Sequence, residues 1–218
     1  MSNAPRFGVI AADPPWSYAN FTDAAHGAAD SAMTTMPYAD MAALPVASWA
    51  APECVLAMWA TFPKLDEALR LMAAWGFAYV TGVPFVKTIP STGAISRGVG
   101  WWFPGAAEVV LFGRVGDVTP ASREKGRNYC GLLSGEGGIL DAVLYAPRGN
   151  RHSGKPETLQ DNLERRLTGP YLELFARRVR PGWSCWGYET GFALTPAGVE
   201  PRPLPREPMP LFDREAAP

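Results

Sequence analysis

Short apolar runs alternate along this sequence with polar segments, some of which show helical periodicity. This alternation is typical of an α/β protein, in which helices cover a twisted sheet. We expect a mixed, mostly parallel sheet with helices on both faces. The strands are predicted at Phe7–Ala12, Cys54–Ala60, Ala78–Val86, Glu108–Phe112, Ala142–Tyr145, Tyr171–Phe175 and Trp183–Trp186.

Two segments carry the spacing of amphipathic helices. Between Lys64 and Trp75, apolar residues recur at helical intervals, and Gly76 stands where a left-handed residue would end the helix. A second helix is predicted at about Glu157–Leu167, whose leucines fall on one face.

Two long segments, Ser17–Met36 and Arg114–Leu140, show no periodic pattern. Connections of this length inside a domain are usually functional loops or disordered insertions. Each follows a predicted strand, and open α/β sheets bind ligands beyond the carboxyl ends of their strands. We therefore expect both segments to lie beside a ligand site.

The length of 218 residues fits one domain, and seven of the 22 prolines fall from Pro196 onward. We predict a single domain over residues 1–193, followed by a Pro-rich tail over 194–218 that is extended or disordered.

The formal net charge of −1 argues against a strongly basic nucleic-acid-binding protein. The cysteines, Cys54, Cys130 and Cys185, lack the spacing of a zinc site or a disulfide framework, so no metal site is expected. No apolar run is long enough to cross a bilayer, and the first residues do not resemble a signal peptide. We expect a soluble, cytoplasmic protein.

The tetrapeptide Asp13-Pro14-Pro15-Trp16 directly follows the first predicted strand. Two consecutive prolines lack backbone N–H donors and hold the chain extended, which leaves carbonyl groups available as acceptors. This set suits an amine on a planar ring: Asp13 and the Pro14 carbonyl accept its two hydrogens, and Trp16 stacks on the ring. The nitrogen lone pair is thereby turned towards an electrophile. A simpler interpretation stays open, in which the prolines make a turn, Trp16 is core and Asp13 caps a helix.

The segment IAADPPWSY resembles the DPPW motif of the MT-A family, and especially of its short bacterial and phage members. These are S-adenosylmethionine-dependent N6-adenine methyltransferases, named after the 70-kDa subunit of the messenger-RNA adenosine methyltransferase. Three further blocks resemble the family in the same order, and the whole resemblance spans about residues 7–189. The blocks are Gly100–Phe103 with Glu108–Gly113, Ala146–Arg148 with Arg151–Glu157, and Tyr171–Arg177 with Arg180–Gly187.

The resemblance implies a Rossmann-like class I methyltransferase fold in circularly permuted order, with the catalytic motif before the cofactor-binding strand. It implies DNA methylation, in which a methyl group passes from S-adenosylmethionine to the N6 amine of adenine, by a protein encoded in a bacterium or a phage. No Gly-rich dinucleotide loop follows a predicted strand, and the resemblance requires none.

By the same resemblance, residues 13–16 form the catalytic site for the target amine. The cofactor-binding residues that it implies are Asp13, Lys155, Glu173, Arg177, Tyr188 and Glu189. The alternative for Lys155 is a solvated cation before a helix, and the alternative for Glu173 and Arg177 is a structural pairing of buried charges.

The sequence departs from the family at three places. Val179 and Arg180 stand where many members carry a polar pair that contacts the cofactor ribose, Tyr188 replaces an asparagine that helps to hold the cofactor, and Ala107 replaces a common histidine. Cofactor binding is therefore less secure than the intact DPPW motif suggests.

The nucleic-acid contacts are predicted in loops that carry cations and aromatic rings, because cations pair with phosphates and rings stack on bases. The predicted substrate-binding residues are Tyr18, Arg97, Trp101, Arg123, Lys125, Arg127, Arg148 and His152. A solvated cationic face and a core position for Trp101 are the alternatives. His152 has no catalytic partner in the sequence, so a structural role or a phosphate contact is favoured over a general base. Ser17–Met36 resembles the mobile gate loop of the family.

Two other functions stay open. The same motifs serve an RNA adenosine N6-methyltransferase, although the sequence carries no zinc-finger or basic RNA-binding extension. A catalytically weak or inactive nucleic-acid-binding subunit is favoured by Val179 and Tyr188 and disfavoured by the intact motif. A monomer and a homodimer are both compatible with the sequence.

Overall fold

Strand β1 (Phe7–Ala12) lies inside an eight-stranded sheet with the order β5-β6-β3-β4-β2-β1-β7-β8. The computed structural model describes residues 6–18, 35–98, 102–118, 139–140, 143–147, 154–187, 189–190, 192–195 and 198–201. The other strands of the sheet are β2 (Ala50–Ala60), β3 (Ala78–Thr88), β4 (Ala107–Val115), β5 (Ile139–Leu140), β6 (Val143–Pro147), β7 (Tyr171–Leu174) and β8 (Trp183–Trp186). The helices are α2 (Tyr38–Ala42), α3 (Val46–Trp49), α4 (Leu65–Ala74), α5 (Thr158–Arg166) and the short 3-10 helix η1 (Phe62–Lys64).

The sheet is mixed and mostly parallel, as the sequence predicts. β1 runs parallel to β2 and β7, β7 runs parallel to β8, and β3 runs parallel to β6. β4 is antiparallel to both of its neighbours, β2 and β3, and β5 is antiparallel to β6. Six strands therefore point one way, and β4 and β5 point the other way.

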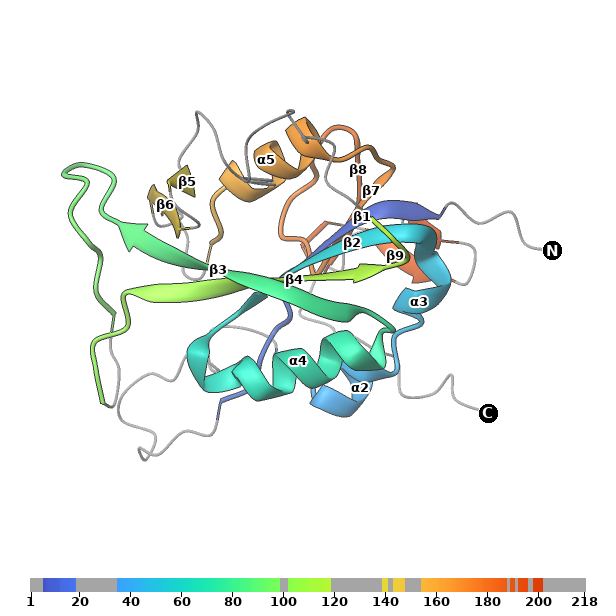
Figure 1. Cartoon of the computed structure of the whole chain (residues 1–218), viewed down its shortest axis with the longest axis horizontal. Helices are drawn as coiled ribbons and strands as arrows, with labels where there is room; N and C mark the ends of the chain where they lie inside the picture. Colours follow the sequence, from blue (N-terminus) through green and yellow to red (C-terminus); the bar gives the residue numbers. More distant parts are fainter. Residues whose placement is uncertain are drawn as a thin grey trace.

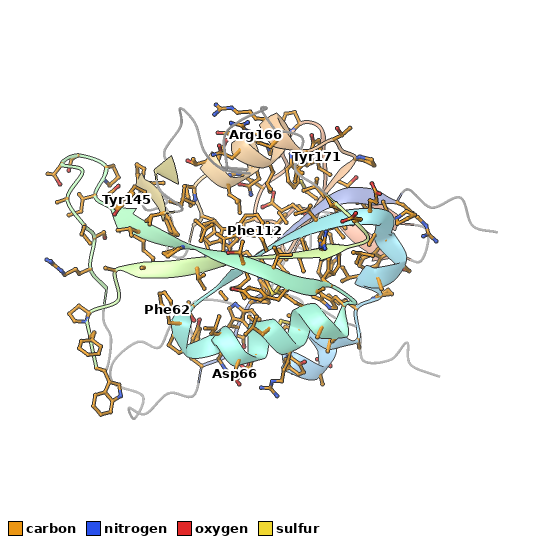
Figure 2. All side chains as sticks on the ribbon, in the orientation of Figure 1. Phe62, Asp66, Phe112, Tyr145, Arg166 and Tyr171 are labelled. Carbon is orange, nitrogen blue, oxygen red and sulfur yellow. The ribbon has the colours of Figure 1, made fainter. Side chains whose placement is uncertain are left out.

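Helices cover both faces of the sheet, which confirms the predicted layering. Successive strand residues point to opposite faces, so Ile10 and Ala12 pack in the core beneath α2, α3 and α4, whereas Val9 and Ala11 pack in the core beneath α5. Figure 1 shows α2 and α4 on one side of the sheet and α5 on the other. In Figure 2, Asp66 of α4 and Arg166 of α5 lie on these opposite sides.

The predicted elements are present, with small changes at their ends. β1 and β8 coincide with the predictions, and β2 begins four residues earlier than predicted, at Ala50. Gly76 has φ +82°, so it ends α4 in the predicted left-handed conformation. The short α2 and α3 and the small β5 were not predicted, because each is too short to show a period in the sequence.

A two-stranded antiparallel hairpin, β9 (Phe192–Thr195) with β10 (Gly198–Pro201), follows β8. It crosses the domain boundary that the sequence places at residue 193, so β10 lies within the segment assigned to the tail. The division into domain and tail otherwise stays a prediction.

The segment Arg114–Leu140 does not begin at the expected edge of the sheet. Because β4 is antiparallel, its end at Val115 pairs with Cys54 near the start of β2, whereas β1 and β3 end at the opposite edge. The expectation that this segment starts beside the ligand site is therefore wrong, since it assumed a parallel strand. Residues 119–138, which carry most of the segment, lie outside the described residues.

Among the described residues, no helix has the length and apolar character needed to span a membrane.

Candidate active site

Charged side chains gather where β1, β2 and β3 end and the antiparallel β4 begins. We call this the carboxyl edge. These side chains lie on the face of the sheet that α5 covers, because alternate residues of a strand point to the same face. Each stands an even number of residues from a residue of its own strand that packs beneath α5; they are Asp13, Trp59, Lys87 and Glu108. Lys155, which lies in the segment before α5, reaches the same edge from above this face. Five side chains from distant parts of the sequence thus meet on one face.

Two lysines and two carboxylates form a continuous network of ion pairs at this edge. Lys155 Nζ lies 3.2 Å from Asp13 Oδ1 and 3.0 Å from Glu108 Oε2. Lys87 Nζ lies 2.7 Å from Glu108 Oε1. The side chains of Asp13, Glu108 and Lys155 are 18%, 10% and 13% exposed, so these charges are largely removed from water. We call these four residues the charge network.

The network controls the protonation of its members. Burial raises the pKa of Asp13, and the nearby Lys155 opposes that rise. Burial alone would raise the pKa of Glu108, but Lys155 and Lys87 outweigh it, so the pKa lies below its ordinary value. Burial alone would lower the pKa of Lys155, but the carboxylates of Asp13 and Glu108 outweigh it, so this pKa is raised. Lys155 therefore stays charged, whereas burial acts against the charged form of Asp13.

The backbone of the DPPW segment is held in place on both sides. The Asp13 N–H donates to Leu174 O of β7 at 3.3 Å, and the Trp16 N–H donates to Pro14 O at 2.9 Å. Pro15 O accepts from the Met36 N–H at 3.0 Å. The Pro14 carbonyl keeps a second lone pair, because a carbonyl oxygen can accept two hydrogen bonds.

Trp16 is part of the core, as the simpler interpretation of the motif proposes. Its side chain packs in the cluster beneath α2, α3 and α4, the residue is 5% exposed, and its indole N–H donates to Trp59 O at 3.2 Å. Trp16 therefore fixes the DPPW backbone against the end of β2. Stacking of Trp16 on a substrate ring stays a prediction.

Tyr18 lies just beyond the motif and contacts the end of β2. Its hydroxyl group is 2.7 Å from Thr61 Oγ1, and Lys64 Nζ lies 5.6 Å from the centre of its ring. Burial raises the pKa of the Tyr18 hydroxyl. Residues 19–34, which follow and include most of the expected gate loop, lie outside the described residues.

Glu173 on β7 forms a second polar site beneath α5. Its Oε1 accepts a hydrogen bond from Gln160 Nε2 at 3.2 Å. Its Oε2 and the Gln160 Oε1 are buried and have no hydrogen-bond partner in the part of the chain that the structure describes. Burial raises the pKa of Glu173 to about 6. Two acceptors without donors mark this position as one that can take donors from a ligand.

The chain makes a tight corner after β7. Phe175 has φ +61°, an uncommon value for a residue with a large side chain, and its ring packs against Trp186 and Trp75. Arg177 follows this corner, and its charge lowers the pKa of Asp13. A cation that acts on Asp13 through its charge thus follows this corner in the chain.

The structure brings together only some of the predicted site residues. Asp13 and Lys155 are in contact, Glu173 lies on the strand next to β1, and Arg177 acts on Asp13 through its charge. Arg97 is exposed on the β3–β4 connection, and Glu189 is exposed in the turn after β8. The remaining predicted residues lie outside the described residues: Trp101, Arg123, Lys125, Arg127, Arg148, His152 and Tyr188.

Glu108, Lys87, Trp59 and Gln160 were not predicted as site residues. Glu108 left a usable signal, because an acidic residue at the start of the apolar run EVVLF needs a buried cation as partner. Lys87 left a corresponding signal, because a cation at the end of an apolar strand needs an acidic partner. Trp59 gave no such signal, because it lies in an apolar run that is typical of a core strand. Its ring centre lies 5.5 Å from Lys155 Nζ.

Comparison with known proteins decides the family. The MT-A70 family model matches residues 7–189. The chain belongs to the MT-A70 family. This confirms the family and the Rossmann-like α/β class predicted from the motifs; the circular permutation stays a prediction.

Two curated relatives of this MT-A70 chain are informative. It is 28% identical over 204 residues to the type II methyltransferase M.MunI from a Mycoplasma species, covering 84% of this chain and 78% of the relative. It is 27% identical over 195 residues to the human N(6)-adenine-specific methyltransferase METTL4, covering 84% of this chain. The match spans only 37% of METTL4.

The site of this MT-A70 chain fits the cofactor of such enzymes, which generally use S-adenosylmethionine. An ammonium group has three N–H donors, so Lys155 keeps one after it has paired with Asp13 and Glu108. The buried Glu173 Oε2, which has no partner among the described residues, suits a hydroxyl donor. A cation for a carboxylate and an acceptor for hydroxyl groups are the donor and acceptor types that this cofactor requires.

Proposed function

We propose that this protein is a methyltransferase that uses S-adenosylmethionine to methylate the N6 amine of adenine in DNA. The observation that carries the proposal is the Lys155–Asp13 pair at the end of β1, where Asp13 directly precedes Pro14. Family membership and the similarity to the type II methyltransferase M.MunI and to the N(6)-adenine-specific methyltransferase METTL4 support it.

Asp13 and Pro14 orient the amine. The Asp13 carboxylate accepts one N–H and the Pro14 carbonyl accepts the other, which turns the nitrogen lone pair out of conjugation with the ring. Asp13 does this as an anion, so Lys155 matters because it opposes the rise in the pKa of Asp13 that burial causes. Asp13 does not have to remove a proton before attack; the proton leaves once the nitrogen is cationic.

When bound, the cofactor would supply a methyl group on a sulfonium, and the neutral thioether that departs as the new N–C bond forms is a good leaving group. Lys155 and Glu173 are the residues that we assign to its carboxylate and its hydroxyl groups. Catalysis by the protein then rests on positioning and on exclusion of water rather than on strong acid–base chemistry. The burial of the charge network fits this requirement.

We propose that the substrate is DNA and that the target adenine is taken out of the base stack. An adenine inside a duplex does not present its N6 amine to a site at the edge of a sheet, so the base must be flipped out. The net charge of −1 limits non-specific attraction to phosphates, so contacts must be local. Location in the cytoplasm and the oligomeric state, monomer or homodimer, stay predictions.

The test uses labelled S-adenosylmethionine with matched DNA and RNA oligonucleotides that contain adenine. We expect label in DNA with the natural chain and little with Asp13→Ala. Label in RNA alone would support the RNA alternative instead. If the cofactor fails to bind in calorimetric titration, with and without nucleic acid, the non-catalytic subunit is favoured.

A further inference from the structure

Two large aromatic side chains project into solvent from the connection between β3 and β4. Trp102 is 91% exposed and Phe103 is 81% exposed. The described segments of this connection extend beyond the end of the sheet (Figure 1), and Tyr145 of β6, 48% exposed, lies at the same end (Figure 2). Soluble proteins rarely expose neighbouring aromatic rings to this extent unless the rings bind something. We call the connection, described for residues 89–98 and 102–106, the aromatic arm.

The backbone of Lys87 joins the arm to the charge network. The Lys87 N–H donates to Ala106 O at 3.0 Å, and Lys87 O accepts from the Ser96 N–H at 2.8 Å, so both legs of the arm bond to its backbone. The side chain of Lys87 pairs with Glu108, which pairs with Lys155. The arm is therefore placed relative to Asp13 by direct contacts.

The two legs also bond to each other nearer the tip. Gly98 and Gly105 exchange hydrogen bonds of 2.7 and 3.1 Å, as in an antiparallel ribbon. Trp102 and Phe103 lie between these glycines in the sequence, on the tip side of the bridge. Because the two legs are already paired, the arm loses less conformational entropy on binding than a single strand would.

The charge of the arm suits a polyanion. Between Lys87 and Glu108 the sequence holds one cation, Arg97, and no Asp or Glu. Exposed rings next to a cation, without acidic residues, match the chemistry by which proteins stack on bases and unstack base steps. A protein partner would also bury the rings, but it would have no need for this absence of acidic groups or for the link to the charge network.

We propose that the aromatic arm is a nucleic-acid element whose Trp102 and Phe103 insert against the base stack of duplex DNA and fill the space that the extruded adenine leaves. This inference rests on the proposed function and specifies the form of its substrate. The side chains replace the stacking that the duplex loses when the adenine moves to Asp13.

The test compares rates on a duplex and on the same target strand as a single strand. For Trp102→Ala/Phe103→Ala we expect the duplex rate to fall about 10-fold or more, since stacking is worth about 1–3 kcal/mol per base, while the single-strand rate stays within about two-fold. Tyr79→Ala, at an exposed aromatic residue near the other end of β3, should leave both rates unchanged.

Equal losses on both substrates, or no loss on the duplex, would overturn the proposal. A wild-type dimer that the double variant splits, seen by analytical ultracentrifugation with an unchanged ratio of the two rates, would assign the rings to a second copy of the chain and also overturn it. If the wild type methylates no DNA, the proposed function fails. Binding of the duplex, measured by fluorescence anisotropy, then still tests the arm: weaker binding by the double variant supports it, and equal binding refutes it.

Discussion

Asp13 experiences two opposing influences, burial and the neighbouring cation Lys155. Burial favours the neutral acid, whereas Lys155 at 3.2 Å favours the carboxylate. An amine needs an acceptor, and only the carboxylate accepts at both of its oxygens. Lys155 is therefore as important to the chemistry as Asp13 is, even though it does not have to touch the adenine.

The amide variant Asp13→Asn isolates the role of the charge. Asparagine keeps the shape of the side chain but offers an N–H group to Lys155 and a weaker acceptor to the amine. We expect the rate of methyl transfer to fall by about 100-fold or more, measured with a saturating concentration of labelled S-adenosylmethionine. Asp66→Asn changes an acidic residue on the solvent side of α4 and should leave the rate unchanged.

Replacing Glu173 should raise the stability of the fold and lower the affinity for the cofactor. Its pKa in the folded protein is about 6, above the ordinary 4.5. The fold therefore favours the protonated form, so this contribution to stability is fully present below about pH 4.5 and is lost as the pH rises through about 6.

Glu173→Gln removes that cost and gives Gln160 Oε1 a possible donor. We expect the variant to be more stable than the natural chain by about 1–2 kcal/mol at pH 8 and equally stable at pH 4.5, as measured by thermal unfolding at both pH values. Affinity for S-adenosylmethionine should fall at pH 8. If the variant binds S-adenosylmethionine at pH 8 with the affinity of the natural chain, Glu173 is not a cofactor-binding residue.

At the scale of elements, one arginine fastens the loop between β7 and β8 to α5. Arg180 donates to Glu164 at 2.8 Å, to Asp161 at 2.7 Å and to Glu157 at 3.4 Å. The Trp183 indole N–H also donates to Glu164, at 2.6 Å. The motif resemblance predicts a cofactor-contacting residue at the position of Arg180. Here Arg180 instead holds the helix that carries Gln160, and thereby the partner of Glu173.

Replacing Arg180 should therefore loosen α5. We expect Arg180→Ala to lower the free energy of unfolding by about 2 kcal/mol, because charge-assisted hydrogen bonds are lost and three carboxylates on one helix face are left to repel one another. Urea unfolding measures the change. Arg70→Ala breaks an exposed i,i+4 pair with Asp66 and should cost less than about 0.5 kcal/mol; similar losses in the two variants would contradict the role of Arg180.

Elements with a strong period could be predicted from the sequence, and contacts between elements could not. The strand at Phe7–Ala12 and the left-handed Gly76 follow from local pattern. The direction of β4 does not, because an apolar strand has the same pattern whether it runs parallel or antiparallel. The role of Glu108 depends on that direction, since only an antiparallel β4 brings its first residues to the carboxyl edge. The motif residues around Asp13 were found because resemblance supplied their context.

At the scale of the whole molecule, charge limits how the protein binds nucleic acid. The chain has a formal net charge of −1, so attraction to DNA must come from a few local cations and from stacking. We expect a weak salt dependence, with a slope of log K against log [salt] between about −2 and −4. Anisotropy titrations of one duplex at several salt concentrations measure it. A slope near −8 would mean an extended phosphate interface and contradict recognition by a few contacts.

The fold also joins segments that lie at the two ends of the matched region. β1, which carries the DPPW motif, pairs directly with β7, which carries Glu173, and Asp13 bonds to the end of that strand. The target amine and the cofactor thus have their proposed residues on adjacent strands, while Lys155 from the segment before α5 and Glu108 from β4 close the site.

The most direct test of the proposed function is mass spectrometry of the nucleosides from DNA treated with the purified protein and S-adenosylmethionine. We predict N6-methyladenine with the natural chain and with Asp66→Asn, and a reduction of about 100-fold or more with Asp13→Asn. Methylation at another atom, or equal amounts of N6-methyladenine from all three proteins, would contradict the role of Asp13 as the residue that orients the amine.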